Sequence, residues 1–258
     1  MKIERITDLE RQYAMQSLDG QFETHNNYKF VVRLEKAFAE KIGTKHSVGF
    51  VNGTATLHTA LEAAGVTMGD EVIVPPLTMS STALAVIQAN AIPVFADVDE
   101  KTFLISAPDI EKKITPKTKA IMPVHMLGNP CKMDQIMEIA KKHNLYVIED
   151  CCQAVGASYK GKCCGTIGDV GAYSLNVFKT ITTGDGGFVG CSDSDLYERA
   201  FGFHDQGHKP SRMGVEVGNR SIVGVNMRMN ELSGAVAVAQ GRKLPALLET
   251  LRYKKGLL

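Results

Sequence analysis

The stretch Leu145-Tyr-Val-Ile-Glu-Asp150 carries the clearest fold signal in the sequence. An apolar run that ends in carboxylates is typical of a buried strand that reaches the edge of a parallel sheet. Open α/β sheets bind ligands at the carboxyl ends of their strands, so Asp150 is a candidate site residue. Because an unpaired buried carboxylate is costly, Asp150 calls for a cationic or protonated partner. A helix cap or a magnesium ligand would explain the same residue equally well.

On either side of this stretch, short apolar runs rich in β-branched residues alternate with helical patterns. Strands are predicted at 47–51, 71–74, 92–96, 119–124 and 145–148. Helices are predicted at 54–64, 80–89, 108–114 and 131–143. This alternation predicts an α/β fold, an α/β/α sandwich in which helices cover both faces of a mostly parallel sheet. Two further strands at 172–177 and 187–191 and a long helix at 230–255 are expected to follow.

Composition narrows the class of protein. The chain has 258 residues, 29 basic and 28 acidic side chains, and 44% hydrophobic residues. Ample apolar content excludes a disordered chain, and a net charge of +1 argues against nucleic-acid binding. No apolar run is long enough to span a membrane, and acidic residues occupy the place of a signal-peptide core. We therefore expect a cytoplasmic protein with neither membrane nor nucleic-acid partners.

Six cysteines occur at positions 131, 151, 152, 163, 164 and 191. In a chain without an export signal they are expected to be reduced thiols. Structural zinc sites separate paired cysteines by two to four residues, and the pairs at 151–152 and 163–164 are adjacent. No metal site is predicted.

Two segments could hold a phosphate and a carbonyl compound. Asn52-Gly-Thr54 lies between a predicted strand and helix, where unpaired N–H groups and the helix dipole favour an anion. An ordinary N-capped helix is the simpler interpretation of that segment. Lys179 lies in an apolar stretch, where burial would lower the proton affinity of its amine and make it a nucleophile. A surface lysine in a hairpin is the alternative.

A phosphate cradle, a strand-end aspartate and a desolvated lysine together match the needs of pyridoxal 5′-phosphate (PLP) chemistry. Seven ordered motifs also make the chain resemble the DegT/StrS-type sugar aminotransferases of PLP fold type I. These motifs are Asn52-Gly-Thr-Ala-Thr-Leu57, Gly69-Asp-Glu-Val-Ile-Val-Pro75, Pro123-Val-His-Met-Leu-Gly128, Glu149-Asp-Cys-Cys-Gln-Ala154, Ser174-Leu-Asn-Val-Phe-Lys179, Thr183-Gly-Asp-Gly-Gly187 and Asn226-Met-Arg-Met229. The resemblance runs from Phe30 to the long terminal helix.

The resemblance implies a role for each matching residue. Lys179 would be the catalytic residue that holds PLP as an internal aldimine and then moves protons. Asp150 would pair with the ring nitrogen, and Gln153 would bind the ring hydroxyl. The other implied cofactor-binding residues are Thr54, Ala55 and Ser174 at the phosphate, Met79 over the ring, and Asn226 at the cofactor of a partner subunit. A homodimer with shared active sites is therefore expected.

The implied reaction transfers an amino group from an amino acid, usually glutamate, to a keto-sugar that is typically nucleotide-linked. Cyclitol ketone aminotransferases that use glutamine remain an alternative, as does a non-catalytic PLP-binding regulator or scaffold. A dinucleotide-dependent oxidoreductase is a further rival, although the three-glycine fingerprint is missing. Lys179 argues against the dehydratase branch of the family, which has histidine at this place.

Three features depart from the family pattern. Met79 takes the place of an aromatic residue, although its sulfur can cover a ring by dispersion. Gln206 replaces a histidine that many relatives have before the glycine at 207. Relatives also continue into a smaller C-terminal domain, so residues 1–258 are expected to form the PLP-binding large domain alone, with the small domain absent or truncated.

Overall fold

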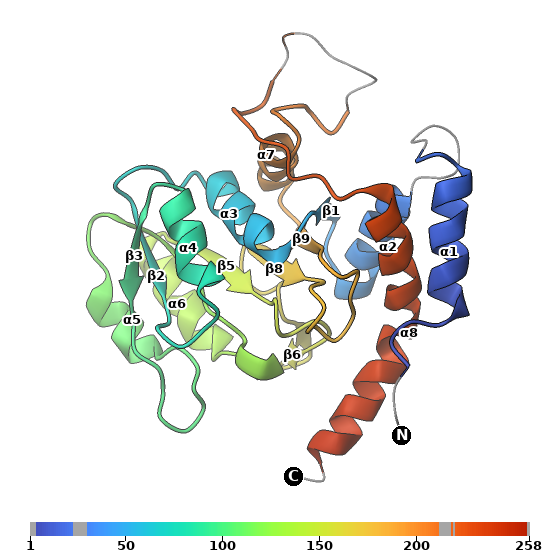
Figure 1. The fold of residues 1–258 in the computed structure, drawn as a ribbon. Helices are drawn as coiled ribbons and strands as arrows, with labels where there is room; N and C mark the ends of the chain where they lie inside the picture. The colour runs from blue at the N-terminus through green and yellow to red at the C-terminus, as the bar shows by residue number, and fades with distance from the viewer. Residues whose placement is uncertain (1–3, 23–29, 212–217, 219, 257–258) are drawn as a thin grey trace.

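The computed structural model describes residues 4–22, 30–211, 218 and 220–256. A seven-stranded sheet in the order β1-β9-β8-β5-β4-β2-β3 forms its centre (Figure 1). The parallel strands are β2 (Glu71–Val74), β3 (Ile92–Phe95), β4 (Thr118–Ile121), β5 (Tyr146–Asp150) and β8 (Val170–Ser174). The antiparallel strands β9 (Gly187–Cys191) and β1 (His46–Phe50) complete one side. The predicted mostly parallel α/β fold is confirmed.

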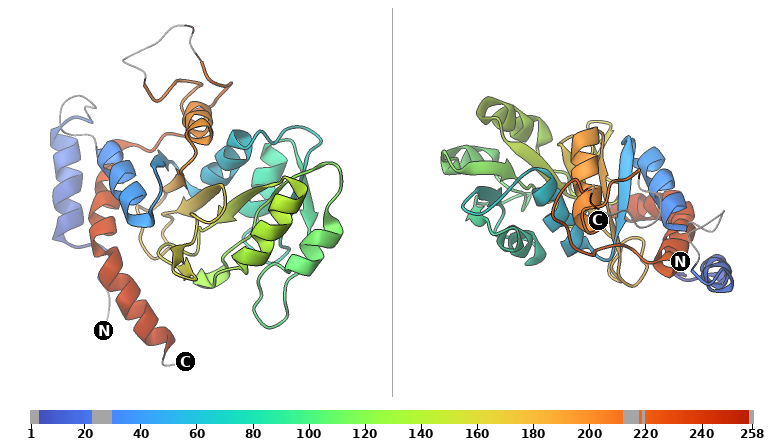
Figure 2. Two further views of the ribbon diagram at one scale, coloured as in Figure 1. Left: turned by 180° about the vertical axis from the view of Figure 1, so that it is seen from behind. Right: turned by 90° about the horizontal axis from the view of Figure 1, so that it is seen from above.

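Helices cover both faces of the sheet, as Figure 2 shows from behind and from above. One face packs against α3 (Gly53–Ala63), α4 (Ser81–Gln88) and α7 (Ser194–His204). The other face packs against α5 (Ala107–Lys113) and α6 (Met133–His143). Their apolar side chains form two cores on opposite sides of one sheet, which is the predicted α/β/α sandwich.

A third core lies beside β8 and β9, where the long helix α8 (Glu231–Lys255) packs between α1 (Asp8–Asp19) and α2 (Phe30–Ile42) (Figure 1). The C-terminal half of α8 extends beyond the sheet. Helix α8 contacts both α1 and the loop that follows β8. It therefore connects the N-terminal segment to the site described below. No helix of the described ranges is both long and apolar enough to cross a membrane.

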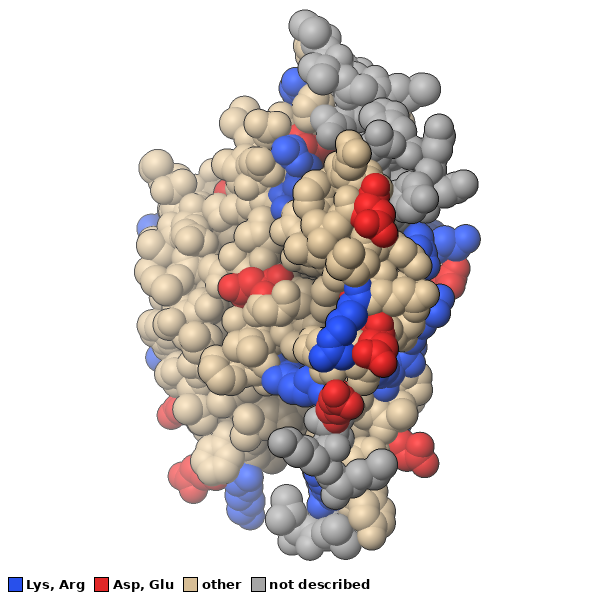
Figure 3. Space-filling model, turned by 45° about the vertical axis from the view of Figure 1, so that its right-hand side comes forward, with Lys and Arg blue, Asp and Glu red and all other residues tan. Residues whose placement is uncertain are grey.

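Small elements complete the chain. A two-stranded ribbon pairs β6 (Ser158–Tyr159) with β7 (Lys162–Cys163), and a 3₁₀ turn, η1, spans Met126–Gly128. Most predicted boundaries agree with the structure to within two residues, but β4 ends at Ile121 and β8 at Ser174, each three residues before its predicted end. On the face drawn in Figure 3, basic and acidic side chains are interspersed, in keeping with the small net charge.

Candidate active site

One cavity of about 420 Å³ lies at the carboxyl ends of β5 and β8, where α3 and α4 begin. Six of the predicted cofactor-binding residues line it, although they lie far apart in the sequence. These are Thr54, Met79, Asp150, Gln153, Ser174 and Lys179. Ala55 and Asn226 are not among its lining residues.

The N-terminus of α3 forms one wall of the cavity and packs directly against β8. A Cβ atom on Gly53 would lie only 2.7 Å from the Cβ of Ser174, so the close approach requires glycine. Asn52 caps the helix, because its side chain accepts a hydrogen bond from the Ala55 N–H at 2.9 Å. The helix is therefore N-capped, as the simpler interpretation predicts, and the cap engages the N–H of Ala55, a residue that the resemblance places at the phosphate.

The capping leaves a place for an anion. The first N–H groups of a helix have no partner within the helix, so those of Gly53 and Thr54 remain available beside the cavity. The Thr54 hydroxyl donates to Ser81 Oγ at 3.1 Å, which ties α3 to the start of α4. Hydroxyls of Thr54 and Ser174 thus lie beside a helix N-terminus, an arrangement that suits a phosphate group.

Asp150 is a buried carboxylate held by neutral groups. It is 4% exposed. Its carboxylate accepts the Thr82 hydroxyl at 2.9 Å and the Cys152 N–H at 3.1 Å. Among the described residues Asp150 forms no ion pair, and a carboxylate can accept more than two hydrogen bonds. Its remaining capacity fits a protonated nitrogen in the cavity better than the alternative of a helix cap.

Lys179 lies in the loop that follows β8, which we call the lysine loop, residues 176–184. Its amide donates to the Asn176 carbonyl at 2.9 Å, which closes a tight turn. The prediction of a buried lysine is wrong for the single chain, because Lys179 is half-buried and its neighbour Phe178 is 91% exposed. Val177 and Phe178, just before the lysine, are exposed, whereas Ile181, two residues after it, is buried in the core.

The other predicted residues differ in their placement. Gln153 lines the cavity, and its side-chain oxygen accepts the Leu127 N–H at 3.1 Å. Met79 also lines the cavity and is 64% exposed. Asn226 is exposed, forms an isolated β-bridge with Asp205, and does not line this cavity.

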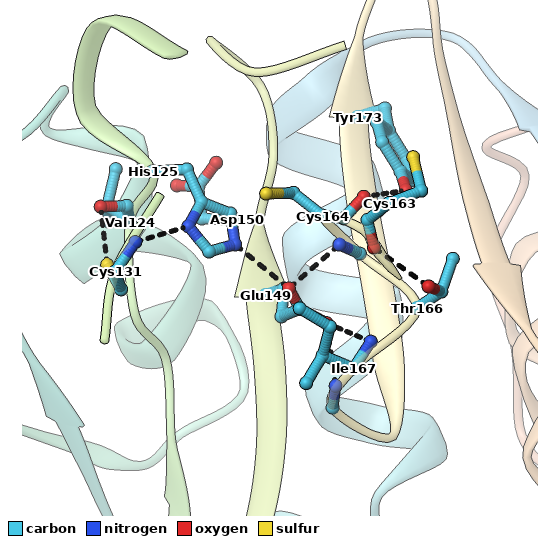
Figure 4. Close-up of polar contacts among 12 residues, drawn as sticks. Val124, His125, Cys131, Glu149, Asp150, Cys163, Cys164, Thr166, Ile167 and Tyr173 are labelled. Carbon is cyan, nitrogen blue, oxygen red and sulfur yellow. Dashed lines mark hydrogen bonds and ion pairs between the residues drawn. The ribbon is translucent and has the colours of Figure 1, made fainter. Parts of the chain in front are cut away.

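A buried network surrounds Glu149, the neighbour of Asp150 in β5 (Figure 4). The Glu149 carboxylate accepts His125 Nε2 at 2.9 Å and the amides of Gly165, Ile167 and Gly168 at 2.6–2.8 Å. The other ring nitrogen of His125, Nδ1, accepts the Cys131 N–H at 3.0 Å, so Nε2 is the nitrogen that faces Glu149. Glu149 thus anchors the loop before β8.

His125, Glu149 and Cys151 place three ligand-type atoms within 4.8 Å of one another. Hydrogen bonds already use both ring nitrogens of His125 and both oxygens of Glu149. Burial and nearby carboxylates raise the pKa of the Cys151 thiol well above its ordinary value, so the thiol stays protonated. The cluster therefore has the character of a structural network and not of a metal centre.

Several lining residues escaped the sequence analysis, notably Ser81, Cys152, Asn176 and Asp185. Burial and the adjacent Asp150 raise the pKa of the Cys152 thiol well above its ordinary value, so this thiol is a neutral wall group. Thr82, which holds Asp150, was also missed. The signal available for Thr82 was its place in a polar run at the start of the helix predicted over 80–89.

Comparisons with known proteins identify the family of this chain. The model of the DegT/DnrJ/EryC1/StrS aminotransferase family matches residues 4–255. The chain is 43% identical to the GDP-perosamine synthase of Escherichia coli O157:H7, and the match covers 98% of this chain and 69% of that protein. The structure of the aminotransferase from Psychrobacter cryohalolentis has a TM-score of 0.88 and 37% identity, covering 95% of this chain and 64% of that one.

A further solved structure contains the expected cofactor. The E. coli GDP-4-keto-6-deoxy-D-mannose-3-dehydratase with bound hydrated PLP has a TM-score of 0.84 and 29% identity, covering 94% of this chain and 67% of that one. The chain thus spans about two thirds of the length of these relatives. The predicted resemblance is confirmed, and the chain belongs to the DegT/DnrJ/EryC1/StrS aminotransferase family.

Proposed function

We propose that this chain forms the cofactor-binding part of a PLP-dependent aminotransferase that transfers an amino group from an amino acid, glutamate, to a nucleotide-linked keto-sugar. The observation that carries the proposal is the pairing of Asp150 and Lys179 in one cavity. Asp150 is a buried carboxylate whose protein partners are neutral. Lys179 supplies an amine to the same cavity from the loop after β8. A protonated aromatic nitrogen and an aldehyde are the groups that such a pair would take.

The surrounding residues fit the remaining parts of the cofactor. The N-terminus of α3, with Thr54 and Ser174, would bind the phosphate. Gln153 would donate its amide to the ring hydroxyl, and Met79 would cover one face of the ring. When bound, PLP supplies a ring that accepts electrons from the substrate.

The chain's own residues then control protons. Asp150 would keep a proton on the ring nitrogen, because a buried carboxylate stabilises a neighbouring cation. The amine of Lys179 would take up and return the proton on the reacting carbon of the amino acid and of the sugar. Both roles require the two side chains to stay in the cavity that they now line.

The similarity to a GDP-perosamine synthase supports a GDP-linked keto-sugar as the acceptor. A homodimer with shared sites is part of the proposal, since Asn226 is exposed outside its own cavity and is free to face a partner's. The exposed Phe178 and Met79 beside the cavity would then be covered by that partner.

Hydride trapping tests the proposal. Protein mixed with PLP should absorb visible light, and borohydride should fix the cofactor on the peptide that contains Lys179. Lys179→Ala should lose both signals, whereas Lys160→Ala, which removes an exposed surface lysine, should keep them. An adduct on another peptide, or no adduct, would contradict the proposed site.

Donor and acceptor are tested separately. The full-length enzyme should convert a GDP-linked keto-sugar to an amino sugar with glutamate as the donor. Transfer from glutamine to a cyclitol ketone would favour the cyclitol alternative. Cofactor binding without transfer from either donor would favour a regulator or scaffold.

A further inference from the structure

The lysine loop is held from outside by the beginning of the chain. The guanidinium of Arg5 donates from Nη1 to the Val177 carbonyl at 2.5 Å and from Nη2 to the Lys179 carbonyl. These two carbonyls flank Phe178, so Arg5 binds the backbone on both sides of one exposed residue. More than 170 residues of sequence separate the guanidinium from its acceptors.

The backbone of Arg5 is itself fixed by α8. Its carbonyl accepts the side-chain amide of Gln240 at 2.6 Å and the ammonium of Lys243 at 2.8 Å. The side-chain oxygen of Gln240 accepts the Thr182 N–H at 3.2 Å, three residues beyond Lys179. Gln240, which is 2% exposed, thus joins the N-terminal segment to the lysine loop.

A buried charge strengthens this junction. Glu10 of α1 is 2% exposed and accepts Gln240 Nε2 at 2.8 Å and Lys243 Nζ at 2.6 Å. Desolvation opposes its ionisation, but hydrogen bonds from Lys243, Thr7 and Gln240 outweigh that cost and lower the pKa of Glu10 to about 2. The N-terminal segment is therefore attached to α8 by a charged network and not by apolar packing alone.

We propose that Arg5 is a positioning residue that fixes the lysine loop and thereby sets the place of the Lys179 amine. A guanidinium suits this role because its N–H groups form a rigid fork that can reach two acceptors at once. Arg5 is exposed, so it is not needed to fill the core. The importance of the amine for catalysis rests on the proposed function, whereas the hold on the loop does not.

Hydrogen–deuterium exchange of the protein without added cofactor tests the hold on the loop. In Arg5→Ala, amides of residues 176–184 should exchange about tenfold faster than in the wild type, as the loss of hydrogen bonds from a charged donor predicts. Arg11→Ala is the matched control, because Arg11 lies in the same segment and its guanidinium pairs with the exposed Asp8 at 3.1 Å. Exchange that is unchanged in Arg5→Ala, or that rises equally in Arg11→Ala, would overturn the proposal.

The placement of the amine is tested by rescue and by rate. Arg5→Lys should recover less than half of the lost protection, since an ammonium lacks the fork that spans both carbonyls. Borohydride-trapped PLP should accumulate on Lys179 severalfold more slowly in Arg5→Ala, while the melting temperature stays at the Arg11→Ala value. Full recovery by Arg5→Lys would refute the two-carbonyl hold, and equal trapping rates would refute its effect on the amine. If the wild type traps no PLP, the proposed function fails, but the exchange experiment still decides the role of Arg5.

Discussion

Asp150 shows how a single residue can report the chemistry of a site. Its two hydrogen bonds come from the hydroxyl of Thr82 and the amide of Cys152, and it is 4% exposed. Neutral donors compensate only part of the cost of burying a carboxylate. A ligand with a protonated nitrogen would provide the missing positive charge.

This leads to a prediction for Asp150→Asn. The amide loses the negative charge that stabilises a protonated ring nitrogen, which is worth about 1.5–3 kcal/mol. We expect PLP to bind roughly 10- to 150-fold more weakly, as measured by absorbance titration. Asp134→Asn, at an exposed ion pair with Lys160, should leave the affinity unchanged. Equal affinities for the wild type and Asp150→Asn would exclude the assigned role.

Glu35 gives a prediction for the pH dependence of stability. Desolvation by burial, opposed by the Gly49 N–H and aided by the charge of Glu231, raises the pKa of Glu35 to about 7. Between pH 4.5 and pH 7 the folded state therefore retains a proton that the unfolded state has lost. Stability attributable to this group falls as the pH rises through that range.

Glu35→Gln should remove this pH dependence while its amide oxygen still accepts the Gly49 N–H. We expect the variant to be more stable than the wild type by up to about 3 kcal/mol at pH 8, with a much smaller difference at pH 4. Urea unfolding at both pH values measures the difference. A difference that does not change with pH would contradict the assignment.

For single residues, the sequence predicted which polar side chains line the cavity better than it predicted how buried they are. Asp150, Ser174 and Lys179 were predicted to share a site and all line one cavity, because each lies at or just after the end of a strand. The exposure of Lys179 could not be predicted from the sequence. An apolar neighbour such as Phe178 looks the same in the sequence whether it faces the core or the surface. Thr82 was missed because its partner lies 68 residues away.

Among the elements, β5 carries two carboxylates with different tasks. Asp150 faces the cavity, whereas Glu149 accepts backbone amides from the loop before β8 and the ring of His125 (Figure 4). Alternation along a strand sends consecutive side chains to opposite faces, which explains the division. The network fixes the strand end that carries Asp150.

Glu149→Gln is therefore expected to destabilise the fold. Its NH₂ group would face backbone N–H donors and leave at least one of them without an acceptor, at a cost of roughly 3 kcal/mol. Urea unfolding should show a lower midpoint with an unchanged slope. Glu111→Gln, at an exposed ion pair with Lys142, is the control and should leave the midpoint unchanged. A wild-type midpoint for Glu149→Gln would show that the network contributes little.

The accuracy of the element predictions follows from the source of each pattern. Parallel strands are buried on both faces, so their continuous apolar runs were located correctly from sequence. Helix α1 was missed because its buried residues are Glu10, Tyr13 and Ser17, which give no apolar period. Burial of Glu10 depends on its contacts with Lys243 and Gln240, and a local sequence pattern does not predict partners so far away in the chain.

At the scale of the whole molecule, two exposed apolar residues border the candidate site. Phe178 is 91% exposed, Met79 is 64% exposed, and both line the cavity. Water has free access to a cavity bordered in this way, and amine chemistry on PLP benefits from its exclusion. A second copy of the chain over this region would cover both residues and bring Asn226 to the neighbouring site.

Phe178→Asp tests this arrangement. A charge at the centre of an apolar contact should dissociate the proposed homodimer, because a carboxylate without a partner is costly to bury. We expect the sedimentation coefficient to shift from dimer to monomer and PLP affinity to fall at least tenfold. Tyr253→Asp, at an exposed aromatic on the end of α8, should change neither. Both substitutions add one negative charge. Loss of the dimer in Phe178→Asp but not in Tyr253→Asp would therefore place the interface on the side of the cavity. A dimer that survives both would place the interface elsewhere.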